Sequence, residues 1–167
     1  MKLHVVLITL ISAGMALISS IATSETWGNI STIESKPLNE LWLNPGFYTY
    51  HFQSNLQLND NNLGFGGEYR YSTTSAVVLG EFHNSDWGTS DYIGWYWRPI
   101  AIGLIGMGAE IGVIDGYPKF SNGGWFPVVV PVASYEYKNV GANIIVIPNF
   151  KEQMHGGISL QLKVKLF

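Results

Sequence analysis

Apolar and polar side chains alternate along most of this chain. The clearest case is the last segment, 157–167, where aliphatic residues occupy every second position from Ile158 to Leu166. The same period of two recurs in segments 46–58, 63–71, 76–82, 91–97, 102–114, 125–137 and 141–147. Successive side chains of a β-strand point to opposite faces, so each segment predicts a strand. Eight strands with short connections predict an all-β fold, an eight-stranded antiparallel up-and-down barrel over residues 46–167.

The alternation alone does not say which face of the barrel is outside. Charged residues are 13% of the chain, about half the usual quarter, which is low for a surface that meets water. Several segments reach about ten residues, the length that a tilted strand needs to cross a bilayer. We therefore predict a transmembrane β-barrel with its apolar face toward lipid. A soluble lipid carrier, with its apolar face inward, is the rival interpretation.

The N-terminus has the pattern of a secretory signal peptide. Lys2 supplies a positive start, Val5–Ala16 is apolar, and Ser20-Ile21-Ala22 fits a small-x-small cleavage site. We assign residues 1–22 to this signal. It predicts export, and with the barrel it predicts a location in the bacterial outer membrane.

Residues 23–45 are predicted to form an N-terminal arm that contains a short amphipathic helix. Leu38, Leu41 and Trp42 have the i, i+3, i+4 spacing of one helix face. A frayed arm without a helix is the alternative.

The composition excludes several classes of function. The chain has no cysteine, which excludes disulfides and cysteine-based metal sites. Its formal charge of −3 and its lack of a basic stripe argue against nucleic acid as a partner. Its four histidines show no ligand spacing, so we predict no metal and no cofactor. We expect a monomer.

The predicted lumen has an apolar and a polar zone. Three segments are apolar on both faces: 76–79, 128–132 and 144–147. Charged residues are predicted on inner faces elsewhere, namely Glu68, Arg70, Glu81 and Glu110. Because each buried methylene contributes roughly 0.8 kcal/mol, such an interior could hold an acyl chain below a reactive rim. A lumen filled by its own side chains is the alternative, and it is usual for eight strands.

Two prolines interrupt the strand predicted over 125–137. Pro127 and Pro131 cannot donate to a β-ladder. We expect local loss of pairing there, either as a lateral gap that admits a lipid or as a simple bulge.

The densest group of reactive side chains is His83-Asn84-Ser85, at the start of a polar loop. A serine hydroxyl needs an adjacent base before it can attack an ester. Ser85 is the candidate nucleophile, and either His51 or His83 could be its base. Asp86 or Asp91 could supply a carboxylate.

Several short motifs resemble the PagP family of outer-membrane lipid A palmitoyltransferases. Phe82-His83-Asn84-Ser85 is similar to the Phe-x-Asp-Ser of that family, and Trp97-Arg98-Pro99 to its Trp-Arg-Pro turn. The segment Phe126–Ser134 is similar to its proline-rich strand, and Ile147-Pro148 to its next turn. The resemblance covers nearly the whole chain after the signal peptide, although each motif is short.

The resemblance implies an interfacial helix before the barrel and transfer of an acyl chain from a phospholipid to lipid A. It places catalysis on a His, an Asp and a Ser at the outer mouth, and it implies a glycine-floored pocket, for which Gly94 is the nearest candidate. Ser85 matches the serine of the family. Asn84 stands where the aspartate would be, and no histidine aligns with that of the family.

We predict an acyltransferase-like barrel with phospholipid and lipid A as partners. The predicted catalytic residues are Ser85, His51, His83 and Asn84, with Asn84 orienting the base. The residues predicted to contact substrate are Glu81, Asp86, Arg70, Gly94, Pro127 and Pro131. The alternative is a non-catalytic outer-membrane barrel with a lipid-binding, structural or surface-interaction role.

Overall fold

The computed structural model describes residues 29–149 and 154–167. The predicted signal peptide, 1–22, lies outside the described residues. In the described part of the chain, no helix is long and apolar enough to cross a membrane.

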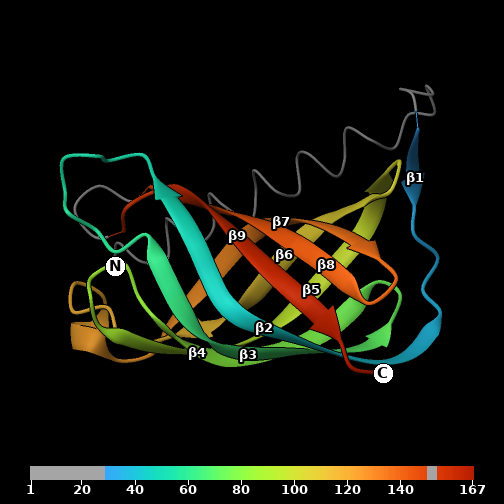
Figure 1. Cartoon of the computed structure of the whole chain (residues 1–167), viewed down its shortest axis with the longest axis horizontal. Coiled ribbons are helices and arrows are strands. Elements are labelled where there is room, and N and C mark those ends of the chain that lie inside the picture. The colour runs from blue at the N-terminus through green and yellow to red at the C-terminus, as the bar shows by residue number, and fades with distance from the viewer. Residues whose placement is uncertain (1–28, 150–153) are drawn as a thin grey trace.

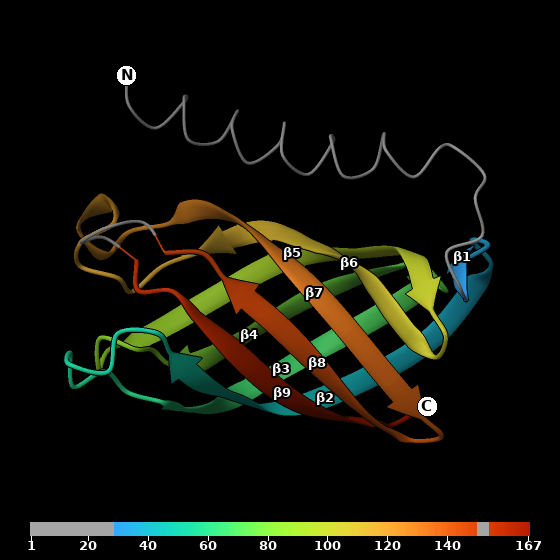
Figure 2. The same cartoon turned by 90° about the horizontal axis from the view of Figure 1, so that it is seen from above.

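Eight antiparallel strands form a closed barrel (Figures 1 and 2). They are β2 (Pro37–His51), β3 (Asn61–Ser72), β4 (Ser75–His83), β5 (Thr89–Ile102), β6 (Ile105–Ile114), β7 (Phe126–Tyr137), β8 (Val140–Ile147) and β9 (Gly157–Lys165). Each pairs with its neighbours in the chain, and β2 pairs with β9 to close the cylinder. A short additional strand, β1 (Ile30–Thr32), pairs with the last residues of β5. The predicted all-β class, strand number and antiparallel order are confirmed.

The two ends of the barrel differ (Figure 2). The connections β2–β3, β4–β5, β6–β7 and β8–β9 lie at one end, which we call the loop end. The connections β3–β4, β5–β6 and β7–β8 lie at the other, which we call the turn end, together with β1 and the C-terminus. The first set includes the longest connections, and the second consists of two-residue turns.

The outer surface is apolar and the inner surface is polar. Outward-facing side chains include Phe65, Leu79, Ile93 and Leu162, which are 50 to 66% exposed. Inward-facing side chains that are buried are largely polar or charged: Thr49, His51, Asn62, Glu68, Arg70, Arg98, Ser134, Asn143, Ser159, Gln161 and Lys163. This inverts the usual arrangement of a water-soluble domain, which exposes few contiguous large apolar side chains.

Paired charges fill the half of the lumen next to the turn end. The network consists of Glu40, Glu68, Arg70, Arg98, Glu136, Lys163 and Lys165. Lys163 Nζ lies 2.6 Å from Glu68 Oε2 and 2.9 Å from Glu136 Oε1. Removing one partner of a buried pair typically costs about 3–5 kcal/mol, because the other charge stays buried. The interpretation of a side-chain-filled lumen therefore holds for this half of the barrel.

Three local predictions are wrong. No helix occurs in the described part of the arm, because Leu38, Leu41 and Trp42 lie in the first part of strand β2. The strand predicted over 46–58 ends at His51, where the chain leaves the barrel. Glu81 does not face the lumen: it lies on the exposed outer side of β4.

A bulge in β2 decides which way His51 points. The pairing with β3 shifts by one residue between Asn44 and Gly46. Asn44 is buried before the bulge, and Thr49 and His51 are buried after it, so the inward positions change from even to odd numbers. Gly46 has a φ of +96°, a conformation that favours glycine. Without this bulge, His51 would face outward.

Gly46→Ala is expected to destabilise the barrel and to reduce any activity that depends on His51. A Cβ on Gly46 would lie 2.3 Å from the backbone oxygen of Asn62, and the positive φ adds strain of about 1–3 kcal/mol. The measurement is the urea midpoint of the refolded protein in detergent, with Gly67→Ala as the matched control. A Cβ on Gly67 meets only ordinary contacts of 3.9 and 4.0 Å. Equal midpoints for the two variants would contradict the role given to the bulge.

Candidate active site

Three side chains form a continuous hydrogen-bonded chain at the loop end. His51 Nδ1 lies 2.6 Å from Asp60 Oδ1, and His51 Nε2 lies 2.8 Å from Ser85 Oγ. His51 is the last residue of β2, Asp60 directly precedes β3, and Ser85 follows β4. The amide of Thr49 donates to the Asp60 carbonyl at 2.8 Å, which continues the β2–β3 pairing and holds Asp60 beside His51.

This geometry suits nucleophilic catalysis. An ionised carboxylate only accepts hydrogen bonds, so Asp60 selects the histidine tautomer with its proton on Nδ1. His51 Nε2 is then an acceptor, aimed at the Ser85 hydroxyl. The His51 side chain is 4% exposed and that of Asp60 is 53% exposed, so the base is shielded while the acid stays in contact with solvent. A nucleophile, a base and a third group that orients the base are the components of a Ser–His–Asp triad.

Asn84 shapes the loop that carries Ser85 and is not bonded to His51. Its Oδ1 accepts from the amides of Asp86 at 3.0 Å and Gly88 at 2.9 Å. Its Nδ2 donates to Ser90 Oγ and to the Gly116 carbonyl, both at 2.9 Å. An aspartate could not make the last two bonds, because a carboxylate has no donor. The group that orients the histidine is therefore Asp60.

The second candidate base, His83, lies apart from Ser85. Its side chain is exposed on the outer side of β4. Its carbonyl accepts from Asn62 Nδ2 at 2.8 Å and from Asn59 Nδ2 at 3.3 Å. Asp91 is likewise outward-facing, and its amide donates to Asp115 Oδ1. Of the two histidines, the structure brings His51 to Ser85.

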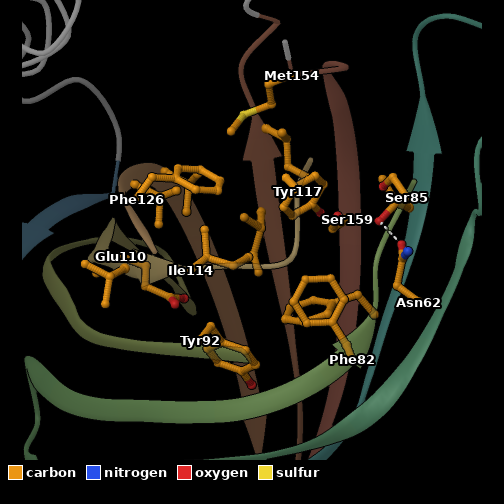
Figure 3. Close-up of a pocket in the computed structure, with 18 of the residues that line it drawn as sticks. Asn62, Phe82, Ser85, Tyr92, Glu110, Ile114, Tyr117, Phe126, Met154 and Ser159 are labelled. Atoms are coloured by element: carbon orange, nitrogen blue, oxygen red, sulfur yellow. Dashed lines mark hydrogen bonds between the residues drawn. The ribbon is translucent and has the colours of Figure 1, made fainter. Parts of the chain in front are cut away.

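Below Ser85, a mainly apolar cavity extends into the barrel (Figure 3). Its volume is about 120 Å³. Its apolar wall comes from the barrel strands: Phe47, Phe82, Tyr92, Ile114, Phe126, Val128, Val130, Ile145 and Ile147. A polar collar of Thr49, Asn62 and Ser159 lies near the mouth, where Thr49 Oγ1 is 2.6 Å from Asn62 Oδ1 and 2.7 Å from Ser159 Oγ.

Glu110 lies at the deep end of the cavity, beside Gly94. A Cβ on Gly94 would lie 3.1 Å from the backbone oxygen of Ile111, 3.3 Å from Val78 Cγ2 and 3.4 Å from Glu110 Oε1. Glu110 lines the cavity, whereas Gly94 is not among the lining residues. Gly112, on the neighbouring strand, lines the same cavity.

The wall of the cavity has an unpaired seam between β7 and β8. The ladder between these strands runs from Val132–Ile145 to Tyr137–Val140 and does not continue toward the loop end. The part of β7 before Val132 pairs only with β6, and it contains Pro127 and Pro131 on its outward face. The expected loss of pairing is therefore observed, and cavity-lining residues flank it on both strands.

The remaining predicted site residues are dispersed. Asp86 lines the cavity together with Ser85. His155, which was not among the predicted site residues, also lines it. Arg70 belongs to the charged network of the other half of the lumen, where its guanidinium contacts Glu40 and Glu136. Glu81 faces outward, away from the cavity. Within residues 29–149 and 154–167, no group of three or more acidic or histidine side chains could hold a metal ion.

Two functional candidates were missed in the sequence. Asp60 stands in the run Asn59–Asn62, which is typical of a turn and gives no sign that its carboxylate returns to His51. Tyr117 also lines the cavity, and it comes from the β6–β7 loop. In comparisons with known proteins, no family model matches the chain, and no curated protein sequence does.

Proposed function

We propose that this protein is an outer-membrane acyltransferase that transfers a fatty acyl chain from a phospholipid to lipid A. The observation that carries the proposal is the Ser85–His51–Asp60 triad at the mouth of an apolar cavity inside a barrel with an apolar outer surface.

The outer surface supports a place in a membrane. Lipid contact would bury the apolar side chains that the barrel exposes, and closure of the barrel pairs every strand with two neighbours, with the β7–β8 seam as the local exception. Toward the loop end, the outward positions become acidic, with Glu81 opposite Asp91 and Asp91 bonded to Asp115. Carboxylates of this kind belong at the level of the headgroups and mark one border of the apolar belt.

The triad supplies a complete path for the acyl group. Ser85 Oγ attacks the ester carbonyl of the phospholipid while His51 Nε2 takes the hydroxyl proton. The resulting oxyanion collapses, the lysophospholipid oxygen leaves, and His51 returns the proton to it. An acceptor hydroxyl then attacks the acyl-serine, again losing its proton to His51, and Ser85 regains its hydrogen as it is released.

The cavity and the seam together suit a long-chain donor. A cavity of about 150 Å³ holds one benzene ring, so the volume of about 120 Å³ has room for roughly six carbons of a chain. A longer chain must extend beyond it. The unpaired part of β7 and β8 provides an apolar exit, and entrance, that faces lipid.

The position of the triad favours an acceptor in the outer leaflet. In bacterial outer-membrane barrels, short turns face the periplasm and longer loops face outside. The triad lies at the loop end. On this orientation Ser85 is level with the outer leaflet, where lipid A is.

The non-catalytic alternative rested on a missing aspartate and an unmatched histidine. Asp60 and His51 fill those two chemical roles from other positions in the sequence. The hydrogen-bond distances are 2.6 Å from His51 Nδ1 to Asp60 Oδ1 and 2.8 Å from His51 Nε2 to Ser85 Oγ. A purely structural role gives no reason for a serine, a histidine and a carboxylate to meet at the loop end of the cavity.

The proposal is tested with purified full-length protein in mixed micelles that contain lipid A and a phospholipid with one isotope-labelled acyl chain. Mass spectrometry should find labelled lipid A and an equal amount of lysophospholipid. Free labelled fatty acid without labelled lipid A would make the protein a lipase and overturn the transfer. Unchanged lipids with heat-modifiable, folded protein would overturn catalysis altogether.

A further inference from the structure

Acyl transfer at Ser85 needs a hydrogen-bond donor for the oxyanion, and the three backbone amides that follow Ser85 are already engaged. In many hydrolases the backbone amide after the nucleophile serves this purpose. Here the amides of Asp86 and Gly88 donate to Asn84 Oδ1, and the amide of Trp87 donates to the Asn84 carbonyl at 3.2 Å. The three amides that follow Ser85 thus point back to Asn84.

The hydroxyls of the polar collar are engaged as well. Thr49 Oγ1 donates its only proton to Asn62 Oδ1, which can only accept. The bond between Thr49 and Ser159 must therefore use the proton of Ser159. Asn62 Nδ2 donates to the carbonyls of Asn59 and His83. The collar has no free proton to offer to a developing negative charge.

Tyr117 is a further potential donor at the mouth of the cavity. It lines the cavity together with Ser85. Figure 3 shows the two residues at the mouth, above Phe82 and Tyr92. The Tyr117 ring packs edge-on against the Phe126 ring, with 6.0 Å between the ring centroids. The Phe126 ring stacks on that of Phe120, with 4.5 Å between the centroids. These contacts hold the ring in place.

We propose that the Tyr117 hydroxyl is the catalytic oxyanion donor for acyl transfer at Ser85, an inference that rests on the proposed function. In the resting site, Ser85 Oγ donates to His51. As Oγ attacks the ester, the negative charge appears on the neighbouring carbonyl oxygen. Rotation of the phenolic O–H lets Tyr117 donate a hydrogen bond to that oxygen.

The phenol keeps its proton throughout. Burial raises the pKa of Tyr117 to about 12, and the negative charge of nearby Asp86 acts in the same direction. Tyr117 thus stays a neutral donor at physiological pH.

The test compares Tyr117→Phe with the native protein on p-nitrophenyl hexanoate and on its thiono analogue, in which sulfur replaces the carbonyl oxygen. Loss of one oxyanion donor typically lowers kcat by roughly 10²–10³-fold. We expect that loss on the oxygen ester with little change in KM. On the thiono ester we expect a loss below about tenfold, because sulfur is a weak acceptor. Tyr50→Phe, on the outer surface, is the control and should behave like the native protein.

Equal losses on both esters would show that Tyr117 only positions Ser85, and would overturn the proposal. A loss below about threefold on the oxygen ester would do the same. His155→Phe tests the other potential donor at the mouth, and the differential loss appearing there instead would also overturn it. Full activity in Ser85→Ala, in contrast, would defeat the proposed function itself, so the two failures are distinguishable.

Discussion

Ser85→Ala is expected to abolish transfer of acyl chains to lipid A while the barrel stays folded. Removing the nucleophile of a Ser–His–Asp triad lowers kcat by roughly 10⁶-fold. Ser85 lies in the loop after β4 and takes no part in the pairing of β4 with β3 or β5, so the substitution leaves both ladders intact. The measurement is the rate of labelled lipid A formation, with heat-modifiable migration as the check on folding.

A covalent intermediate distinguishes this mechanism from direct transfer. Acid quenching of native protein during turnover should give a species whose added mass is one acyl group, located on the peptide that contains Ser85. More than a tenth of native activity in Ser85→Ala, or an acyl group on another residue, would contradict the assignment of Ser85 as nucleophile.

The same assay separates Asp60 from Asn84 as the partner of His51. Asp60→Asn is expected to lower the rate by about 10²–10⁴-fold, because an amide can donate to Nδ1 and so favour the wrong tautomer. The lower limit reflects the half-exposed position of Asp60, where water can partly replace the carboxylate. If Asn84→Asp restored the activity of Asp60→Asn, the orienting acid would belong at position 84 instead. We expect no restoration, since Asn84 Nδ2 donates to Ser90 and Gly116.

The barrel was predictable because each strand repeats the same local signal. Because the period of two recurs in every segment, an error in one segment does not change the predicted fold. Seven of the eight strands lie where the alternation predicts them, and their observed ends differ from the predicted ends by a few residues. The exception is β2, where the bulge after Asn44 breaks the pattern and Phe52, Leu56 and Leu58 continue it by chance beyond His51. Leu38, Leu41 and Trp42 have a helical spacing, but they lie in β2, where the adjacent Leu41 and Trp42 point to opposite faces. Three residues are too few to decide between a helix and a strand.

Only half of the site could be predicted, because its residues are far apart in the sequence and two of them reach the site through the folding of loops. Ser85 and His51 have reactive side chains and polar surroundings that mark them in the sequence. Asp60 acquires its role only because the β2–β3 loop folds back, and Tyr117 only because the β6–β7 loop covers the mouth. Glu81 was predicted on the wrong face because residues 76–79 are apolar on both faces of β4. Their pattern therefore does not show which positions of this strand point into the barrel.

Closing the seam between β7 and β8 is expected to stop transfer from long-chain phospholipids by about 100-fold or more. Extending the register of Val132–Ile145 by two residues would bring Val130 opposite Ile147, and both line the cavity. The chain has no cysteine, so a pair introduced at these positions has no competing thiol. A disulfide requires Cα atoms within about 7 Å, and its formation would therefore draw the two strands together where they are now unpaired.

Oxidised and reduced forms of Val130→Cys/Ile147→Cys are compared on two donors. The oxidised form should lose transfer from the phospholipid yet hydrolyse p-nitrophenyl hexanoate, whose chain fits the cavity and enters from the mouth. Reduction should restore transfer, which excludes damage from the substitutions themselves. Ala133→Cys/Ile144→Cys joins the same strands where they already pair, and it should have no effect in either form. Equal loss on both donors would place the entrance at the mouth, because the seam would then have no part in admitting the lipid.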